Sequence, residues 1–254
     1  MKFPDFIIAG CMKCGTTSLF LNLSKHPDIT MSTRVGPIKE RTMGTEMYYW
    51  TTKLEKTKSL DWYKRRFAGK VSGEKSPGYW AHPGALSNIY KNNPNTKLII
   101  SLRHPVERAF SHYSMFVRRK TNPKPCTLEL IPKNYLRLSR YYELLTNITF
   151  KVFDRKNVHF VISDWMKENP SKEIMKIHKF LGIKPINLPP KEIDWSKKKR
   201  MVYKISKEQS YIFFSKYSKN RLLPNERKKF LKYFKSHNEK LFDFLGFRIS
   251  EWEI

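Results

Sequence analysis

Apolar stretches that predict strands alternate along this chain with stretches of helical periodicity. Short apolar runs, typical of buried strands, occupy residues 7–10, 97–102 and 158–162, and residues 71–75 form a further predicted strand. Helices are expected over residues 16–25, 61–67, 83–92, 105–119, 134–152, 170–181 and 224–244, whereas residues 29–60 are expected to be irregular. This alternation predicts an α/β, P-loop-like three-layer fold, with a central parallel sheet flanked by helices. The sequence shows no internal repeat and no low-complexity linker, so we expect one domain over residues 1–254.

The first apolar run leads directly into a glycine-bounded loop and a helix start. Gly10 and Gly15 have the spacing of a Walker A loop, but the position of the Walker lysine holds Thr16, and the lysine lies inside the loop as Lys13. Loop N–H groups and a helix N-terminus favour an anion, usually a phosphate. The simpler alternative is an ordinary strand-turn-helix in an α/β core. Under either interpretation, we expect Thr16 or Thr17 to cap the helix. The candidate phosphate-binding residues are Lys13, Cys14, Gly15, Thr16, Thr17 and Ser18.

A second candidate anion site follows the predicted strand 97–102. Arg103 stands at the strand's carboxyl end, where α/β proteins bind ligands, and Ser111 follows eight residues later. Together they suit a second phosphate monoester, although a helix-capping arginine and a solvent-exposed serine would also explain them. Two separated phosphates fit a nucleotide with a 5′ group and a 3′ phosphate. A nucleoside triphosphate fits less well, because the Walker lysine is absent and no acidic residue clearly ends a buried strand to bind Mg²⁺. Asp164 is the best candidate for such an acid.

With these motifs the chain resembles the 3′-phosphoadenosine-5′-phosphosulfate (PAPS)-dependent sulfotransferases, especially the branch that modifies heparan sulfate. The resemblance runs through most of the chain in five ordered segments. They are Lys13–Leu19 with His26-Pro27-Asp28, Glu46-x-x-Tyr49-Trp50, Asp61-Trp62-Tyr63 with Glu74-Lys75-Ser76-x-x-Tyr79, Arg103 with Ser111, and Ser218-Lys219-Asn220-Arg221 before Pro224. Two departures are Asn220 in place of a glycine and the lack of cysteine near residues 190–215, where the heparan-modifying enzymes have a disulfide.

The resemblance implies a role for each site residue in sulfuryl transfer. Lys13 would neutralise the leaving 5′-phosphate, and Glu46 would be the general base. Lys75 would contact the sulfuryl group or orient the acceptor, but a structural ion pair is an equal alternative. The 3′-phosphate would lie at Arg103 and Ser111. Lys219, Asn220 and Arg221 would close over the nucleotide. Other candidates for the base are Glu40, His82, His104 and His112.

Composition adds a strong positive charge to this picture. Among 254 residues, 50 Lys and Arg face 22 Asp and Glu, for a net charge of +28. Such a chain is attracted to polyanions, unless the lysines only form a solvated surface. Cys11, Cys14 and Cys126 do not suggest a disulfide framework, and Cys11-x-x-Cys14 lacks the second ligand pair of a zinc site. No apolar run reaches the roughly 18 residues of a membrane span, and no secretory signal is visible, so we expect a cytoplasmic protein.

The sequence therefore predicts a sulfotransferase that uses PAPS, yields 3′,5′-adenosine bisphosphate (PAP) and requires no metal. The expected acceptor is a hydroxyl or amine of a saccharide or small metabolite, with possible polyanion affinity and no specific nucleic acid partner. The alternatives are a P-loop nucleotide or nucleoside kinase and a non-enzymatic polyanion-binding protein.

Overall fold

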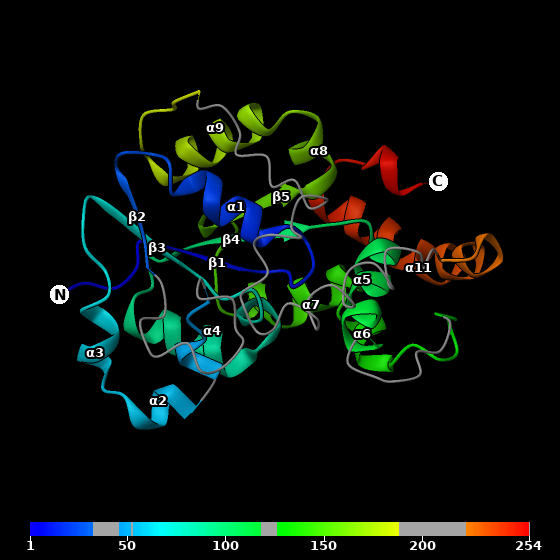
Figure 1. Ribbon diagram of the computed structural model, residues 1–254, viewed down its shortest axis with the longest axis horizontal. Coiled ribbons are helices and arrows are strands. Elements are labelled where there is room, and N and C mark those ends of the chain that lie inside the picture. Colours follow the sequence, from blue (N-terminus) through cyan, green and yellow to red (C-terminus); the bar gives the residue numbers. More distant parts are fainter. Residues whose placement is uncertain (33–45, 52, 118–125, 188–221, 254) are drawn as a thin grey trace, which may run out of the picture. The chain divides into compact units, whose positions relative to one another are not determined.

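A computed structural model describes residues 1–32, 46–51, 53–117, 126–187 and 222–253 (Figure 1). Contacts between residues group the chain into two compact units. The first consists of residues 1–103 and 142–191, and the second of residues 104–141 and 192–254. The chain therefore passes between the units three times, and the single domain over residues 1–254 stays a prediction.

A five-stranded parallel sheet forms the centre of the first unit. Its strand order is β2-β3-β1-β4-β5, so the first strand of the chain lies in the middle. The strands are β1 (Phe6–Gly10), β2 (Ile29–Met31), β3 (Val71–Lys75), β4 (Lys97–Leu102) and β5 (Val158–Ile162). The expected parallel sheet is confirmed. Strand β2 was not expected, because only three residues of the irregular stretch pair with β3.

Helices cover both faces of this sheet (Figure 1). Helices α1 (Thr16–Leu23) and α9 (Pro170–Leu181) bury apolar side chains against alternate residues of β1, such as Phe6 and Ile8. Helix α4 (Pro83–Asn92) lies on the opposite face in Figure 1. The remaining helices of the unit are α2 (Lys53–Thr57), α3 (Leu60–Lys64), α7 (Tyr141–Asn147, except its first residue) and α8 (Ser163–Glu168). Short 3₁₀ turns lie at Tyr49–Thr51, Tyr79–Ala81, Thr149–Lys151 and Arg155–Asn157.

The second unit is helical in its described part. It contains α5 (Pro105–Val117), α6 (Lys133–Arg137), α11 (Pro224–Leu245) and a 3₁₀ turn at Ser250–Trp252. Its core joins Val106 and Ala109 of α5 to Phe230 and Phe234 of α11. The long amphipathic C-terminal helix expected from the sequence is confirmed.

The single helix expected over residues 134–152 is wrong. Helix α6 ends at Arg137, and α7 (Tyr141–Asn147) begins after a break. The Tyr135 carbonyl would accept from the Ser139 N–H in a continuous helix, but it accepts instead from Nη1 of Arg108, at 2.7 Å. The Ser139 N–H turns to the Leu136 carbonyl at 2.8 Å. A buried arginine on α5 therefore stabilises this break, and nothing in the local sequence signals it.

Among the helices of the described residues, none is both long enough and apolar enough to cross a membrane.

Candidate active site

The loop after β1 brings the start of helix α1 to the carboxyl edge of the sheet. Gly15 precedes the helix with a φ of 80°, in the left-handed region that favours glycine. No side chain caps the helix, so the expectation that Thr16 or Thr17 would do so is wrong. The helix instead begins at Thr16 with an open first turn.

The loop's carbonyl groups are held by side chains rather than by the helix. The Lys13 carbonyl accepts from Nη1 of Arg103 at 3.3 Å, and the Cys14 carbonyl accepts from Oγ of Ser101 at 2.6 Å. As in any α-helix, the N–H groups of the first turn have no acceptor within the helix itself. Within the described ranges, the backbone N–H groups of residues 16–18 therefore have no recorded acceptor. Together with the helix dipole, these donors fit the phosphate end of a nucleotide.

Lys75 at the end of β3 connects the first turn of α1 to the proposed base. Its side chain is fully buried, and Nζ lies 3.0 Å from Oγ1 of Thr17 and 3.2 Å from Oε1 of Glu46. Burial lowers the pKa of Lys75, and the nearby Glu46 carboxylate opposes that shift. The structural ion pair considered for Lys75 is therefore present, and it joins two residues of the candidate site.

The backbone of the same strand fixes the position of Glu46. Glu46 forms an isolated parallel bridge with Lys75, and the Met47 N–H donates to the Lys75 carbonyl at 3.2 Å. The next residue, Tyr48, donates its N–H to Oγ of Ser76 at 2.9 Å. Burial and the Glu46 charge raise the pKa of the Tyr48 phenol, which therefore stays neutral. The Glu46 carboxylate thus lies beside a buried ammonium group and a neutral phenol.

Arg103 follows β4, the other neighbour of β1, and its contact with the loop places it at the same edge of the sheet. Ser111 is half-buried on α5, in the second unit. Their combination into one 3′-phosphate site stays a prediction. Lys219, Asn220 and Arg221, like the alternative base Glu40, lie outside the described residues.

The three histidines considered as bases all have structural hydrogen bonds through Nδ1. His82 caps α4 by accepting from the Ala85 N–H at 3.0 Å, and His104 accepts from the Val106 N–H at 3.2 Å. Nδ1 of His112 lies 2.7 Å from Nη2 of Arg108. These contacts account for the histidines locally, and none involves the residues around Lys75.

The other residues considered as metal or redox ligands have ordinary structural surroundings. Cys11 and Cys14 are both buried and do not form a disulfide. Asp164, considered for Mg²⁺, pairs with Lys167 at 2.8 Å.

Glu74 had no role assigned from the sequence, where it is only part of a family segment, although it precedes Lys75 on β3 and is buried. Its side chain is inaccessible, and burial raises the pKa of its carboxyl to about 8, although the hydroxyls of Tyr63 and Tyr79 act in the opposite direction. The only sequence signal is a glutamate within a predicted strand of a parallel sheet, where both faces are covered.

Solved structures share the fold. A sulfotransferase from Alicyclobacillus acidocaldarius superposes with a TM-score of 0.70 at 21% identity, over 100% of both chains. A mouse sulfotransferase complexed with PAP gives a TM-score of 0.54 at 19% identity, over 94% of this chain and 86% of that one. Both likenesses support the P-loop-like three-layer architecture.

Curated relatives include several sulfotransferases. Heparan sulfate glucosamine 3-O-sulfotransferase 6 of Mus musculus is 28% identical over 199 residues, which are 73% of this chain and 54% of that protein. The membrane-associated sulfotransferase kil1 of Dictyostelium discoideum is 32% identical over 130 residues, or 48% of this chain and 25% of that protein. The chain thus spans about half the length of its heparan sulfate relatives.

The family itself follows from a match to nearly the whole sequence. Residues 3–243 match the family model described as the sulfotransferase domain. The match includes β1, its loop and the candidate residues Glu46, Lys75 and Arg103. The resemblance found in the sequence is confirmed, and this chain belongs to the sulfotransferase domain family.

Proposed function

We propose that this protein transfers a sulfuryl group from PAPS to a hydroxyl or amine of a saccharide acceptor. The observation that carries the proposal is the position of Lys75. Its buried Nζ contacts Thr17 at the phosphate-binding helix and Glu46, the proposed base. One ammonium group therefore links the part of the site suited to an anionic donor with the part suited to proton removal.

The donor supplies the sulfuryl group and a leaving 5′-phosphate. Lys13 and the N–H groups of the first turn of α1 bind negative charge at that phosphate. Arg103 and Ser111 bind the 3′-phosphate, and Lys219, Asn220 and Arg221 close over the nucleotide. Glu46 accepts the proton of the acceptor hydroxyl or amine at a carboxylate oxygen, and Lys75 orients that carboxylate. We assign no metal to the reaction.

The acceptor class rests on the curated relatives and on charge. The first relatives are heparan sulfate 3-O-sulfotransferases, and the net charge of +28 suits an acidic saccharide. A small hydroxylated or amine metabolite is the other acceptor class expected from the sequence. Polyanion affinity and a cytoplasmic location stay predictions.

The Glu46→Gln variant tests the assignment of the base. Glutamine keeps the shape of the side chain but cannot accept the proton, so we expect kcat to fall about 10²- to 10⁴-fold. The affinity for PAP, measured by isothermal titration without Mg²⁺, should change less than about twofold, because Glu46 is not assigned to nucleotide binding. Turnover is measured with labelled PAPS and a panel of saccharide and small-molecule acceptors.

Glu168→Gln is the matched control, because Glu168 is an exposed residue at the end of α8. It should leave both turnover and PAP affinity unchanged. Normal turnover in Glu46→Gln would reject Glu46 as the base. If the unaltered protein hydrolyses Mg-ATP and does not bind PAP, the sulfotransferase proposal itself fails and the kinase alternative gains.

A further inference from the structure

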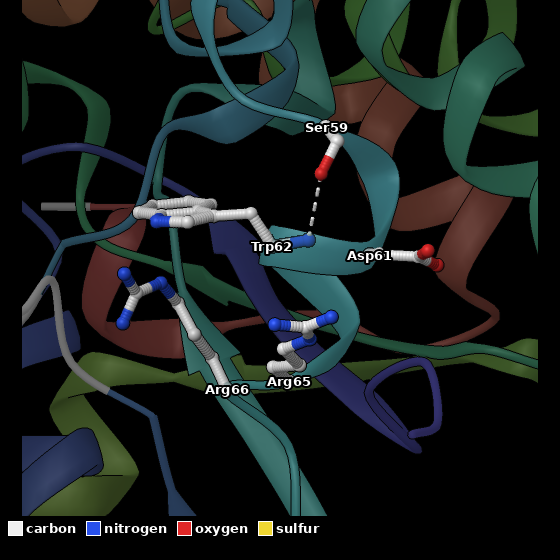
Figure 2. A pocket seen from close by; sticks show the side chains of 5 residues that line it. All are labelled: Ser59, Asp61, Trp62, Arg65 and Arg66. Carbon is white, nitrogen blue, oxygen red and sulfur yellow. Dashed lines mark hydrogen bonds between the residues drawn. The ribbon is translucent and has the colours of Figure 1, made fainter.

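A pocket of about 470 Å³ lies around helix α3, among residues that have no part in the proposed transfer reaction. Figure 2 shows the residues that line it, which are Ser59, Asp61, Trp62, Arg65 and Arg66. Its size is in the range of small-molecule sites. Two arginines within one short segment make it a candidate site for anions.

Local structure orients one of these arginines. Ser59 caps α3 by accepting from the Trp62 N–H at 3.1 Å (Figure 2). Trp62 and Arg66 are four residues apart, and the guanidinium carbon of Arg66 lies 3.6 Å from the centre of the Trp62 ring. A guanidinium stacked in this way keeps its N–H edge available for a planar, two-point contact with an oxyanion.

Neither arginine has an acidic partner within the described parts of the chain. No ion pair with Arg65 or Arg66 is recorded there, and Nε of Arg66 is buried without a hydrogen-bond partner. The carboxylate of Asp61 points away from both guanidinium groups in Figure 2. Burial lowers the pKa of Arg66, as expected for a charge that is partly desolvated and not compensated. An anionic group would satisfy both side chains.

Aromatic contacts connect the pocket to the segment that carries Glu46. The Trp62 ring lies nearly parallel to the Tyr49 ring, with 6.2 Å between centroids, and Tyr49 is three residues after Glu46. The hydroxyl of Tyr49 also donates to the carbonyl of Lys58, just before the cap residue of α3. The pocket therefore belongs to the same packed region of the first unit as the proposed base.

We propose that Arg65 and Arg66 bind a carboxylate or sulfate group of an acidic saccharide acceptor, away from the group that receives the sulfuryl. The saccharide class rests on the proposed function, whereas the anion preference rests on the two unpaired guanidinium groups. A nucleic acid ligand is less favoured, because the Trp62 ring already packs against Arg66 and Tyr49 and is therefore not available for stacking with a nucleobase.

Binding of a heparin-derived hexasaccharide to the full chain, with saturating PAP and about 150 mM salt, tests the proposal. In the double variant Arg65→Gln/Arg66→Gln, two charge-assisted contacts are lost, so we expect affinity to fall about tenfold or more. The control Lys228→Gln/Lys232→Gln removes the same charge from exposed residues of α11 and should cost less than about threefold. PAP affinity should stay within about twofold in both.

A second double variant distinguishes two-point binding by the planar guanidinium groups from the effect of positive charge alone. Arg65→Lys/Arg66→Lys keeps both charges but loses two-point binding, so its affinity should also fall at least about threefold. Arg65→Gln alone covers the possibility that loss of Arg66 disturbs Trp62, because Arg65 is exposed. It should weaken hexasaccharide binding about threefold or more without changing the thermal midpoint.

Equal losses in the arginine and lysine double variants would overturn the proposal, because they would indicate nonspecific attraction. The same conclusion follows if the unaltered chain does not bind the hexasaccharide, or if only binding of a single-stranded oligonucleotide depends on the arginines. These results would leave PAP binding intact. Absence of PAP binding in the unaltered chain would instead be a failure of the proposed transfer function.

Discussion

Two adjacent residues of β3, Glu74 and Lys75, are both fully buried but have opposite electrostatic surroundings. Lys75 has a carboxylate partner in Glu46, so its positive charge is compensated. Glu74 has no cationic partner among the described residues, and neither of its carboxyl oxygens has a hydrogen-bond partner there. A lone buried carboxylate is costly, so this group favours its protonated form. At neutral pH the strand therefore holds a neutral acid beside a paired ammonium group.

The protonation of Glu74 predicts that stability falls as pH rises. Its pKa is about 8 when folded and near 4.5 when unfolded, so the folded state binds the additional proton between these values. The free energy of unfolding should fall by at most roughly 1.4 kcal/mol per pH unit in that window. Urea unfolding between pH 6.5 and 8 measures this contribution as the difference between the unaltered protein and Glu74→Gln. The half-buried His159 and the buried His178, whose pKa values are lowered to about 4, take up protons on unfolding near pH 6.5 and add an opposite slope that is the same in both proteins.

Glu74→Gln should remove the fall in stability that Glu74 causes, because an amide does not titrate, so its stability should fall less, or rise more, with pH than that of the unaltered protein. Glu168→Gln, which changes an exposed glutamate, should keep the slope of the unaltered protein. If Glu74→Gln and the unaltered protein show the same pH dependence, Glu74 is not the group that titrates.

These two residues also show which features of single side chains the sequence could not predict. Lys75 and Glu46 were predicted as site residues from a motif, but their contact could not be, because 28 residues separate them. Glu74 was not recognised as a buried acid, since residues 71–75 are mostly polar. Their burial comes from pairing with β1 and β2 and from helices distant in sequence. Side-chain partners of this kind depend on the folded topology.

Elements with strong local signals were predicted well. Strand β4 is a nearly continuous apolar run, and helices α4 and α9 begin at prolines, so their bounds match the expected residues 97–102, 83–92 and 170–181. Strand β2 was missed because three residues are too few for a periodic pattern. The prediction of one helix over residues 134–152 failed for another reason, since the break is stabilised by the contact of Arg108, on α5, with the Tyr135 carbonyl.

Arg108 should therefore be a large contributor to stability at the break between α6 and α7. Its guanidinium contacts the Tyr135 carbonyl, Oγ of Ser139 and Nδ1 of His112, all between 2.7 and 2.8 Å. Arg108→Met removes these charge-assisted bonds and leaves buried acceptors with fewer donors. We expect a loss of about 2–4 kcal/mol in the free energy of unfolding.

Arg137→Met is the matched control for that measurement. Arg137 is exposed at the end of α6, and its contacts are with the side chain of Asn134. Urea unfolding should show a change within about 0.5 kcal/mol for this variant. Similar losses in the two variants would contradict the assigned role of Arg108.

At the scale of the molecule, the two compact units are interleaved along the chain. Each is assembled from two separate stretches, so neither corresponds to a contiguous segment that a linker could release. Each also has an apolar core of its own, containing Ile99 in the first unit and Phe234 in the second. The sequence showed no linker, which led to the prediction of one domain. Cooperative unfolding is the physical property that distinguishes one domain from two.

We expect the whole chain to unfold in a single transition that both cores control. Ile99→Ala and Phe234→Ala each remove buried apolar volume and should each destabilise the protein by about 2–5 kcal/mol. If the units fold together, both variants lower the same calorimetric transition, and the calorimetric and van't Hoff enthalpies agree. The scans belong at moderate salt, because a net charge of +28 repels itself more strongly at low ionic strength. Lys228→Gln, an exposed control, should leave the midpoint nearly unchanged. Two transitions, of which each core variant moves only one, would show instead that the units are separate domains.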